Sequence, residues 1–507
     1  MVDRVTTQMM QSSALSNIFR LSEDLSKTQN QISLGKKISV PSDDPAGARD
    51  SLQLHATIGQ VNQFIRNINF NTLSLQSGDS ALSTVGSALT QAKQLAISQL
   101  NGVSTGQIRG FTGSAVAQLV TQVLQSANSK VNGKYIFAGT NTLTPPFSAS
   151  ASGAVYTGNS ESLQIEVASG YKVSVGLPGS QVLGTDLNPT LTSSTLLSSL
   201  NGGAGVPGGS FTITSRGGSS STFSVTPGMT LGQLMSNINN SGLNVTASIN
   251  SQQNGIVLTD TSPTVKQALS VAEAGGGTTA TALGIKGRRD GVLVGTDVNP
   301  AITASTQLSQ LNGGAGVSLT SVDIVNGSAS AAVTLSSAKT VGDVLNLINN
   351  AGLNVTASIN SQSNALSVTS NNSSTVAVVS EVGTGTSAQD LGIGGGRNVL
   401  LSLISLRNAL NKNDQQGVLA VLGNLDRGLN MVNNGRAVIG AVQNQVNNIL
   451  SNNNQDVVNL TAQVSSIEDT DLVSAGSHLA QLQTAFQATL STTALIEQQP
   501  NLQNFLK

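Results

Sequence analysis

The sequence predicts an α+β multidomain protein whose N- and C-terminal helical coiled-coil arms pack together and flank inserted β-rich domains. Three observations support this fold class. Apolar residues recur every seven positions near both ends of the chain, the middle is rich in Gly, Ser and Thr, and one long segment of the middle occurs twice. Because a heptad repeat marks helices that lie along one another, the two arms are expected to pair.

The C-terminal arm carries the most regular pattern. Every seventh residue from 425 to 467 is apolar except one amide, Asn453. A helix over this stretch would be roughly 65 Å long, more than a compact domain requires. We expect it to lie along other helices, with Asn453 fixing the register at some cost in stability. The seam residues of this arm are Leu425, Val432, Ile439, Val446, Asn453, Leu460, Ile467, Leu472, Leu479 and Phe486.

The N-terminal arm repeats the pattern over two helices. The first is expected to end at Gly35, since glycine commonly follows a helix C-terminus. Asp44 and Pro45 predict the N-cap and first position of a second, long helix. A third helix is expected from about 114 to 132. The seam residues of this arm are Ile18, Leu25, Ile32, Val61, Ile68, Leu75 and Leu82. Both sets of seam residues are expected to form the assembly interface.

The middle of the chain follows a strand-like pattern and contains a duplication. Alternating residues between 155 and 175 predict two or three short strands. The segment 238–252 returns at 348–362 with one substitution. A period of about 110 residues is too long for a solenoid unit, so each copy is expected to be one small, strand-dominated α+β domain. Each copy would contain one short helix, at 230–239 and at 340–349.

These patterns divide the chain into seven expected segments. In order they are an N-terminal helix and loop (1–44), the N-terminal half of a helical bundle (45–145), a β-rich segment (146–182), outer repeat 1 (183–292), outer repeat 2 (293–397), the C-terminal half of the bundle (398–470) and a C-terminal helix (471–507).

Composition excludes several classes of protein. Only 10% of the residues are charged and the net charge is −1, which argues against a nucleic-acid-binding surface. The longest apolar run, 399–406, is too short to span a bilayer, and the first residues lack the apolar core of a secretory signal. Taken alone, these features predict a soluble cytosolic protein. The absence of cysteine excludes disulfides and thiolate chemistry.

No group of residues predicts catalysis, a cofactor or a metal. Asp43 and Asp44 fit a capping turn far better than a metal site. The carboxylates of 468–471 fit a solvated kink, and a carboxylate site is the lesser alternative. His55 and His478 are the only histidines, and they lack the His-Glu-x-x-His arrangement of zinc enzymes. We therefore expect a protein that is not an enzyme.

Motifs at both ends of the chain resemble the flagellin superfamily. The segment 4–9 resembles the superfamily's N-terminal signature, and 468–475 resembles its C-terminal motif. The segment 35–38 and the loop after it are close to the flagellin loop pattern. The residues of this family-motif loop are Pro41, Ser42, Asp43, Asp44 and Pro45. The repeated Ile-Asn-Asn-x-Gly-Leu-Asn-Val resembles the hook IN motif of flagellar outer domains.

Within the superfamily, one further motif resembles the hook-associated protein 3 family, whose members join hook to filament. It comprises 133–139 followed by Pro146 and Phe147. The resemblance covers about 1–180 and 398–507, and the middle matches only through the hook IN motif. The duplicated insert is larger than is usual in that family, which keeps a flagellin that forms the filament as the alternative.

The resemblance implies a structural subunit of the bacterial flagellum. Such proteins are exported unfolded through the flagellar type III channel without a cleaved signal, which changes the expected localisation to extracellular. The implied partners are a cytosolic export chaperone at the C-terminal arm, other copies of the chain in a ring, a hook-associated protein on the hook side and flagellin on the filament side. No nucleic acid, membrane or cofactor is expected.

Two further hypotheses concern the outer repeats and the arms. A surface adhesin acting through the Gly/Ser/Thr-rich repeats is an alternative of another class, whereas an enzyme carried on this scaffold is remote. Six glycines interrupt the C-terminal helical stretch between Gly417 and Gly476. Each costs about 0.5–1 kcal/mol of helix stability relative to alanine. We therefore expect the outermost arm segments to fold only on docking with neighbouring subunits.

Overall fold

The computed structural model describes residues 7–101, 104–149, 153–226 and 228–498. They divide into two compact units, which are described separately. The terminal unit comprises the described parts of Met1–Asn69, Glu166–Lys172 and Val446–Lys507, and the central unit comprises those of Phe70–Ile165 and Val173–Gln445. Two long helices, α2 (Pro45–Ser98) and α9 (Gln415–Glu468), contribute residues to both units.

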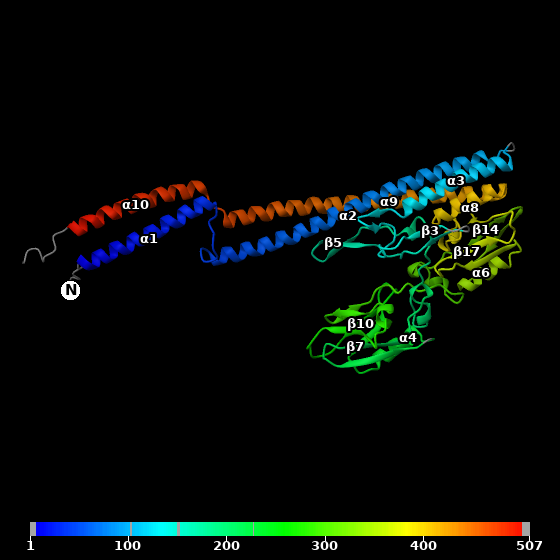
Figure 1. Ribbon diagram of the computed structural model, residues 1–507, viewed down its shortest axis with the longest axis horizontal. Helices are drawn as coiled ribbons and strands as arrows, with labels where there is room; N and C mark the ends of the chain where they lie inside the picture. Colours follow the sequence, from blue (N-terminus) through cyan, green and yellow to red (C-terminus); the bar gives the residue numbers. More distant parts are fainter. Residues whose placement is uncertain (1–6, 102–103, 150–152, 227, 499–507) are drawn as a thin grey trace, which may run out of the picture. The chain divides into compact units, whose positions relative to one another are not determined.

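Helices from opposite ends of the chain form the terminal unit. The helices α1 (Thr7–Leu34) and α10 (Leu472–Gln498) lie side by side (Figure 1). Gly35 follows α1 with a φ of +68°, a conformation that glycine adopts without strain. Asp44 caps α2, and its Oδ1 accepts a hydrogen bond from the N–H of Gly47 at 3.0 Å. Both local features are those that the sequence predicts.

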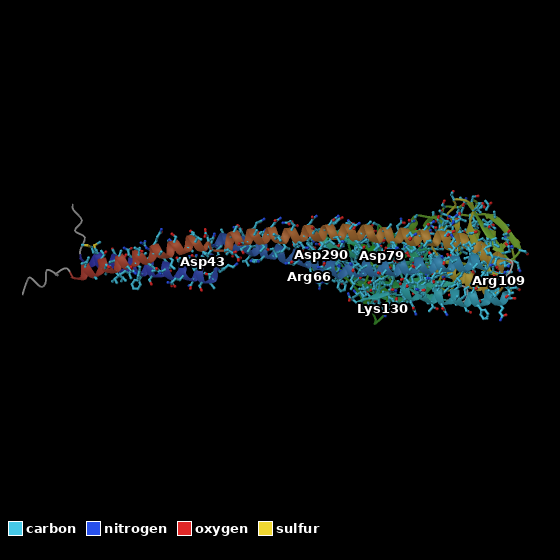
Figure 2. The ribbon with its side chains drawn as sticks, turned by 90° about the horizontal axis from the view of Figure 1, so that it is seen from above. Asp43, Arg66, Asp79, Arg109, Lys130 and Asp290 are labelled. Atoms are coloured by element: carbon cyan, nitrogen blue, oxygen red, sulfur yellow. The ribbon has the colours of Figure 1, made fainter. Side chains whose placement is uncertain are left out.

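A helical layer of the central unit is built from both halves of the chain. The helix α3 (Gly106–Ala127) packs against α8 (Val399–Asn411). Two ion pairs join α2 to α9 within this unit. Lys93 Nζ lies 2.5 Å from Asp426 Oδ1. Arg436 Nε lies 2.8 Å from Oδ1 of Asp79, which Figure 2 labels on α2. The two arms of the chain therefore contact each other in the central unit.

The third helix begins and ends earlier than the expected range of about 114–132. Thr105 is its N-cap, and the Thr105 side chain accepts a hydrogen bond from a backbone N–H of the first turn. At the other end, Asn132 and Gly133 have φ values of 50° and 77° and turn the chain into a hairpin. An Asn-Gly pair favours this type of turn, so the hairpin replaces the expected last helical turn. The strands of the hairpin are β1 (Lys130–Val131) and β2 (Lys134–Tyr135).

Two short hairpins and a helical turn follow, and Glu166–Lys172 of the second hairpin belong to the terminal unit. Three of their strands lie in or next to 155–175, where the sequence predicts two or three. Tyr156 is buried, and its hydroxyl donates to the Phe137 carbonyl oxygen at 3.0 Å. The elements are β3 (Phe147–Ala149), β4 (Ala154–Tyr156), β5 (Gln164–Ala168), β6 (Tyr171–Ser174) and the 3-10 turn η1 (Gly179–Gln181).

Two α+β segments form the rest of the central unit. The elements of the first are η2 (Leu197–Ser199), η3 (Asn201–Gly203), β7 (Gly209–Thr214), β8 (Ser220–Val225), α4 (Leu231–Asn239), β9 (Val245–Ile249), β10 (Ile256–Asp260), β11 (Leu269–Ala274), α5 (Thr279–Ala282), β12 (Gly287–Arg289) and β13 (Val292–Val294). Those of the second are η4 (Leu308–Gln310), η5 (Asn312–Gly314), β14 (Ser321–Asn326), β15 (Ala329–Thr334), α6 (Val341–Asn349), β16 (Val355–Ile359), β17 (Leu366–Ser370), β18 (Ala377–Glu381) and α7 (Ser387–Asp390). The elements follow the same order from η2 to α5 as from η4 to α7.

Threonines at equivalent positions of the two segments precede α4 and α6. Thr230 and Thr340 are the N-caps, and each side chain accepts from the N–H three residues on at 3.2 Å. Their own N–H groups donate to the side chains of Gln233 and Asp343, which completes a capping box in each segment. Each helix therefore begins one residue after the threonine at which the sequence pattern places its start.

The sheets of the two segments differ. The first segment has a four-stranded sheet, β12-β11-β7-β8, and a three-stranded sheet, β13-β10-β9. The second has a three-stranded sheet, β15-β14-β18, and a two-stranded sheet, β16-β17. Each segment buries a separate apolar core. Helical end regions therefore flank a mixed α+β middle made of several small sheets. Within the described part of the chain, no helix combines the length and apolar character that a membrane span requires.

Candidate functional site

The structure brings together two motifs that are more than 400 residues apart in the sequence. Both lie in the terminal unit, one in the loop after α1 and the other at the end of α9. The N–H of Lys37 donates to the carbonyl oxygen of Glu468 at 2.5 Å, and the N–H of Thr470 donates to that of Gly35 at 2.9 Å. We call residues 35–55 together with 468–471 the terminal clamp.

The side chain of Glu468 is the centre of the terminal clamp. Its Oε2 accepts from Lys36 Nζ at 2.5 Å, and its Oε1 accepts from the Ser51 hydroxyl and lies 3.1 Å from His55 Nε2. The side chain is largely covered, with 17% exposed. The hydrogen bond from Lys36, followed by that from Ser51, lowers the pKa of Glu468 to about 2. The same bond raises the pKa of Lys36.

The family-motif loop is shaped by its own aspartates. Asp43 Oδ2 accepts from the N–H groups of Ser39 and Val40 at 3.0 and 3.1 Å, and Lys27 Nζ lies 3.1 Å from Oδ1. The two backbone hydrogen bonds, with smaller contributions from Lys27 and the Ser39 hydroxyl, hold the pKa of Asp43 well below its usual range. Asp44 caps α2. Asp44 thus has the capping role that the sequence favours, whereas Asp43 accepts from the backbone of the loop before it. Figure 2 labels Asp43 at this loop.

The acidic stretch at 468–471 is a kink between two helices. Asp469 Oδ1 lies 3.3 Å from Lys36 Nζ, so one lysine contacts two neighbouring carboxylates. Asp471 accepts from the N–H groups of Val473 and Ser474 at 2.9 and 3.2 Å and caps α10. Among the described residues, no three His, Asp or Glu side chains are arranged to hold a metal ion. Pro41, Ser42 and Pro45 are exposed.

The predicted seam residues fall into three groups by burial within the chain. Those fully buried are Ile68, Leu75, Leu82, Leu425, Val432, Ile439, Val446 and Asn453. Those half-buried are Ile18, Leu25, Ile32, Val61, Leu460, Ile467, Leu479 and Phe486. Leu472 is exposed. The residues nearest the chain ends are therefore the least covered by the chain itself.

Asn453 has a different partner from the one that a helical seam implies. Its side-chain Nδ2 donates to the Val167 carbonyl oxygen at 3.1 Å, within the terminal unit. Val167 belongs to β5, so the amide is bonded to strand backbone rather than to a facing helix. The heptad pattern marks Asn453 as unusual, but it contains no information about β5, which is distant in the sequence.

Sequence reasoning missed a set of exposed apolar side chains in the terminal unit. The side chains of Phe19 and Val473 are 72% and 83% exposed. They lie off the heptad positions of the predicted seam. Apolar residues at positions that a heptad assigns to solvent are the signal that would have identified them. The others are Met9, Met10, Leu15, Leu34, Val40, Leu52, Val458, Leu490 and Leu495, and the predicted seam residue Leu472 is exposed as well.

Comparison with known proteins matches three parts of the chain to flagellin families. Residues 5–142 match the bacterial flagellin N-terminal helical region, 422–506 match the bacterial flagellin C-terminal helical region, and 210–262 match the flagellin hook IN motif. The chain is 31% identical over 180 residues to flagellar hook-associated protein 3 of Salmonella typhimurium. That match covers 35% of this chain and 56% of the relative, so the chain spans about half the length of the curated relative.

Two further relatives are more distant. The flagellar filament 41 kDa core protein of Borreliella burgdorferi is 31% identical over 105 residues, which cover 21% of this chain and 31% of that protein. The crystal structure of FlgL from Xanthomonas campestris is 16% identical and covers 82% of this chain and 99% of that chain, with a TM-score of 0.36. The family assignment rests on the matched regions at both ends and in the first outer segment. The chain belongs to the flagellin superfamily and is similar to hook-associated protein 3.

Proposed function

We propose that this protein is a structural subunit of the bacterial flagellum at the hook–filament junction. The observation that carries the proposal is the match of 180 residues to hook-associated protein 3. The motif 133–139, which favours the same family, lies in the central unit, where its residues Phe137 and Ala138 are buried. Membership of a superfamily of structural proteins supports a role without catalysis.

In this proposal, neighbouring subunits join through the terminal helices. The seam residues buried in the chain hold its two arms together, and the half-buried seam residues near the ends complete their burial against neighbours. The exposed apolar side chains of the terminal unit supply the rest of the interface. Full burial of one such side chain contributes about 1.5–3 kcal/mol, so several of them buried together favour assembly.

The terminal clamp would hold the geometry of this interface. It fixes the loop after α1 to the kink before α10, and these two helices carry most of the exposed apolar side chains. The outermost arm segments would fold completely only against neighbours. Export in the unfolded state, without a cleaved signal, and binding of a cytosolic chaperone to the C-terminal arm fit such a subunit.

The proposed partners are other copies in a ring, a hook-associated protein on the hook side and flagellin on the filament side, all outside the cell. We also infer that 183–292 and 293–397 are two copies of one domain, which the shared order of elements supports. The seven segments given by the sequence remain the proposed domain boundaries.

Deletion of the gene tests the proposed function. If the protein joins hook to filament, the deletion strain keeps its hooks, lacks filaments and releases flagellin monomers into the medium. Complementation with the full chain restores filaments. Filaments of normal number and length in the deletion strain would rule the junction role out.

A filament-forming flagellin is the second candidate, which the match to the Borreliella burgdorferi filament protein and the large insert favour. The same strain separates the two candidates. Loss of the major filament protein band from isolated filaments, with no other flagellin released into the medium, would assign this chain to the filament itself.

A further inference from the structure

The two outer segments differ at one strand edge. In the first, β10 pairs with β9 on one side and with β13 on the other, where Leu258 lies opposite Leu293. In the second, the equivalent strand β17 pairs with β16 alone among the described strands. The register makes the strands equivalent, because Ile249 lies opposite Ile256 and Ile359 lies opposite Leu366.

In the second segment, the residues equivalent to β13 belong to the helix α8. Leu283-Gly284-Ile285 of the first segment returns as Leu391-Gly392-Ile393 in the second. The ninth residue after Leu283 is Val292, which begins β13, whereas the ninth after Leu391 is Leu400, which lies in α8. The residues that complete the first sheet are therefore used for a helix in the second, and no described strand takes their place.

Alternate N–H and C=O groups of β17 face away from β16, towards the position that β13 takes beside β10 in the first segment. The N–H of Asn360 donates to the Ala365 carbonyl oxygen at 2.9 Å, and that of Asn371 donates to the Asn354 carbonyl oxygen at 3.0 Å. Positions 365 and 371 thus face β16, and alternation directs the backbone groups of 366, 368 and 370 to the other side. In the first segment, the equivalent groups bond to the residues that flank β13. The Gly295 N–H donates to the Ile256 carbonyl oxygen, and the Asp260 N–H donates to the Gly291 carbonyl oxygen, both at 2.8 Å.

A groove lies along this edge. Its cavity volume is about 650 Å³, and Leu366–Ser370 of β17, Ala377–Val379 of β18 and the α8 residues Leu401, Ser402 and Ser405 contribute to its lining. Val368 is half-buried, whereas its counterpart Leu258 is fully buried beneath the completed sheet. An open strand edge in a groove is the arrangement that receives an added strand.

We propose that this groove binds an extended peptide segment of another protein, which adds to β17 as an antiparallel strand. The occupant of the equivalent position in the first segment, Val292-Leu293-Val294, indicates the chemistry: a short apolar strand whose central side chain faces inward. Among the described residues that line the groove, Lys412 is the one that carries a charge, and its Nζ already donates to the Thr375 carbonyl oxygen at 2.8 Å. The groove therefore selects an uncharged segment.

A labelled synthetic peptide with the uncharged sequence of residues 291–296 and blocked ends tests the proposal on the full-length chain. Fluorescence anisotropy is expected to show saturable binding. N-methylation of the peptide's leucine should weaken binding at least about tenfold, because it blocks hydrogen bonding in the ladder. N-methylation of either valine should change affinity by less than about twofold, since the valine N–H groups face away from β17. The absence of saturable binding, or equal sensitivity at all three positions, would overturn the proposal.

A protein variant provides a second readout. Ser405→Trp places an indole in the groove and should abolish peptide binding, whereas Ser251→Trp, at an exposed turn of the first segment, should leave it unchanged. Circular dichroism verifies that both variants fold. If Ser405→Trp does not fold, the N-methylated peptides still test the proposal on the parent chain. Self-association that Ser405→Trp removes, without peptide binding to the parent chain, would assign the groove to a second copy and refute a separate partner.

Discussion

At the residue scale, Glu468 shows how one side chain joins two distant motifs. Its carboxylate contacts Lys36, Ser51 and His55, and its carbonyl oxygen accepts from the N–H of Lys37. The sequence marks 35–38 and 468–475 as two separate family motifs. Nothing in their spacing indicates that they touch, because the contact depends on how α1, α2, α9 and α10 meet.

Glu468→Gln is expected to loosen the terminal clamp. The amide keeps the size of the side chain but loses the charge that pairs with Lys36. Because Lys36 is 42% exposed, solvent screening limits the expected loss to about 1 kcal/mol of unfolding free energy. Faster amide hydrogen exchange at 35–38 and 469–471 in the variant would report this loss. Asp50→Asn, at an exposed carboxylate of the terminal clamp that pairs with the neighbouring Arg49, is the control and should change exchange little. Equal exchange in Glu468→Gln and the parent chain would contradict this role.

The terminal clamp should weaken in acid. The folded pKa of Glu468 is about 2, below its ordinary value of 4.5, so the unfolded chain binds more protons between these values. Its stabilising effect is fully present above pH 4.5 and is lost as the pH falls through about 2. Urea unfolding of the parent chain and of Glu468→Gln, followed by circular dichroism between pH 6 and 2.5, measures the difference. A difference that stays constant over this range would contradict the assignment.

Asp186 should show the opposite pH dependence. Burial is the main cause that raises its pKa from 3.8 to about 6, and the nearby carboxylate of Asp297 adds to the shift. The folded chain therefore binds more protons between these values, and stability falls as pH rises from 3.8 through 6. Asp186→Asn can still accept from the Asn188 N–H and should stabilise the chain at pH 7 by about 1–3 kcal/mol.

Urea unfolding at pH 7 and at pH 3.5 checks this prediction. The advantage of Asp186→Asn should be present at pH 7 and largely disappear at pH 3.5, where Asp186 is protonated in the folded chain and mostly protonated in the unfolded chain. Asp456→Asn, on an exposed face of α9, is the control and should show no such pattern. Destabilisation of Asp186→Asn at pH 7 would show that the charge is needed there.

At the scale of single elements, two glycines of α9 differ in how closely other residues pack against them. A Cβ on Gly435 would lie 2.9 Å from Val182 Cγ2 and 3.2 Å from Leu177 Cδ2, so this glycine allows a close approach to the helix. A Cβ on Gly440 would meet nothing within 4 Å. The sequence counts both as costs to helix stability. Only the packing separates the glycine that is required from the one that is not.

Gly435→Ala and Gly440→Ala form a matched pair. Gly440→Ala should stabilise the chain by about 0.5–1 kcal/mol through helix propensity. Gly435→Ala gains the same propensity but overpacks against buried Val182, with a cost of about 1–3 kcal/mol, so it should be neutral to destabilising. Urea unfolding compares the two variants under one condition. Equal stabilisation by both would mean that Val182 moves aside without cost.

At the scale of the whole molecule, assembly is predicted to depend on apolar side chains that the chain leaves uncovered. Val473→Asp places a charge at an 83% exposed position in the first turn of α10. A carboxylate near a helix N-terminus is favourable, so the subunit should keep its fold and thermal stability. Burying that charge against a neighbour would be costly, and filaments should be absent or much reduced.

Electron microscopy of cells that express Val473→Asp, with motility assays, measures this effect. Val265→Asp, at a 60% exposed position of the first outer segment, is the control and should leave filaments intact. Normal filaments in the Val473→Asp strain would remove this face of α10 from the assembly interface.

The sequence by itself determined the helical arms, the α+β middle, the capped start of α2, the places of α4 and α6, and the motifs of the flagellin superfamily. These features are local, because periodicity, Asp44-Pro45 and the capping threonines act within one or two turns of helix. The tertiary structure alone decided what those local features contact. It paired Glu468 with Lys36, bonded Asn453 to the backbone of β5, and left the edge of β17 open where the equivalent residues entered α8. Contacts between distant residues depend on the path of the whole chain, which no short stretch of sequence contains.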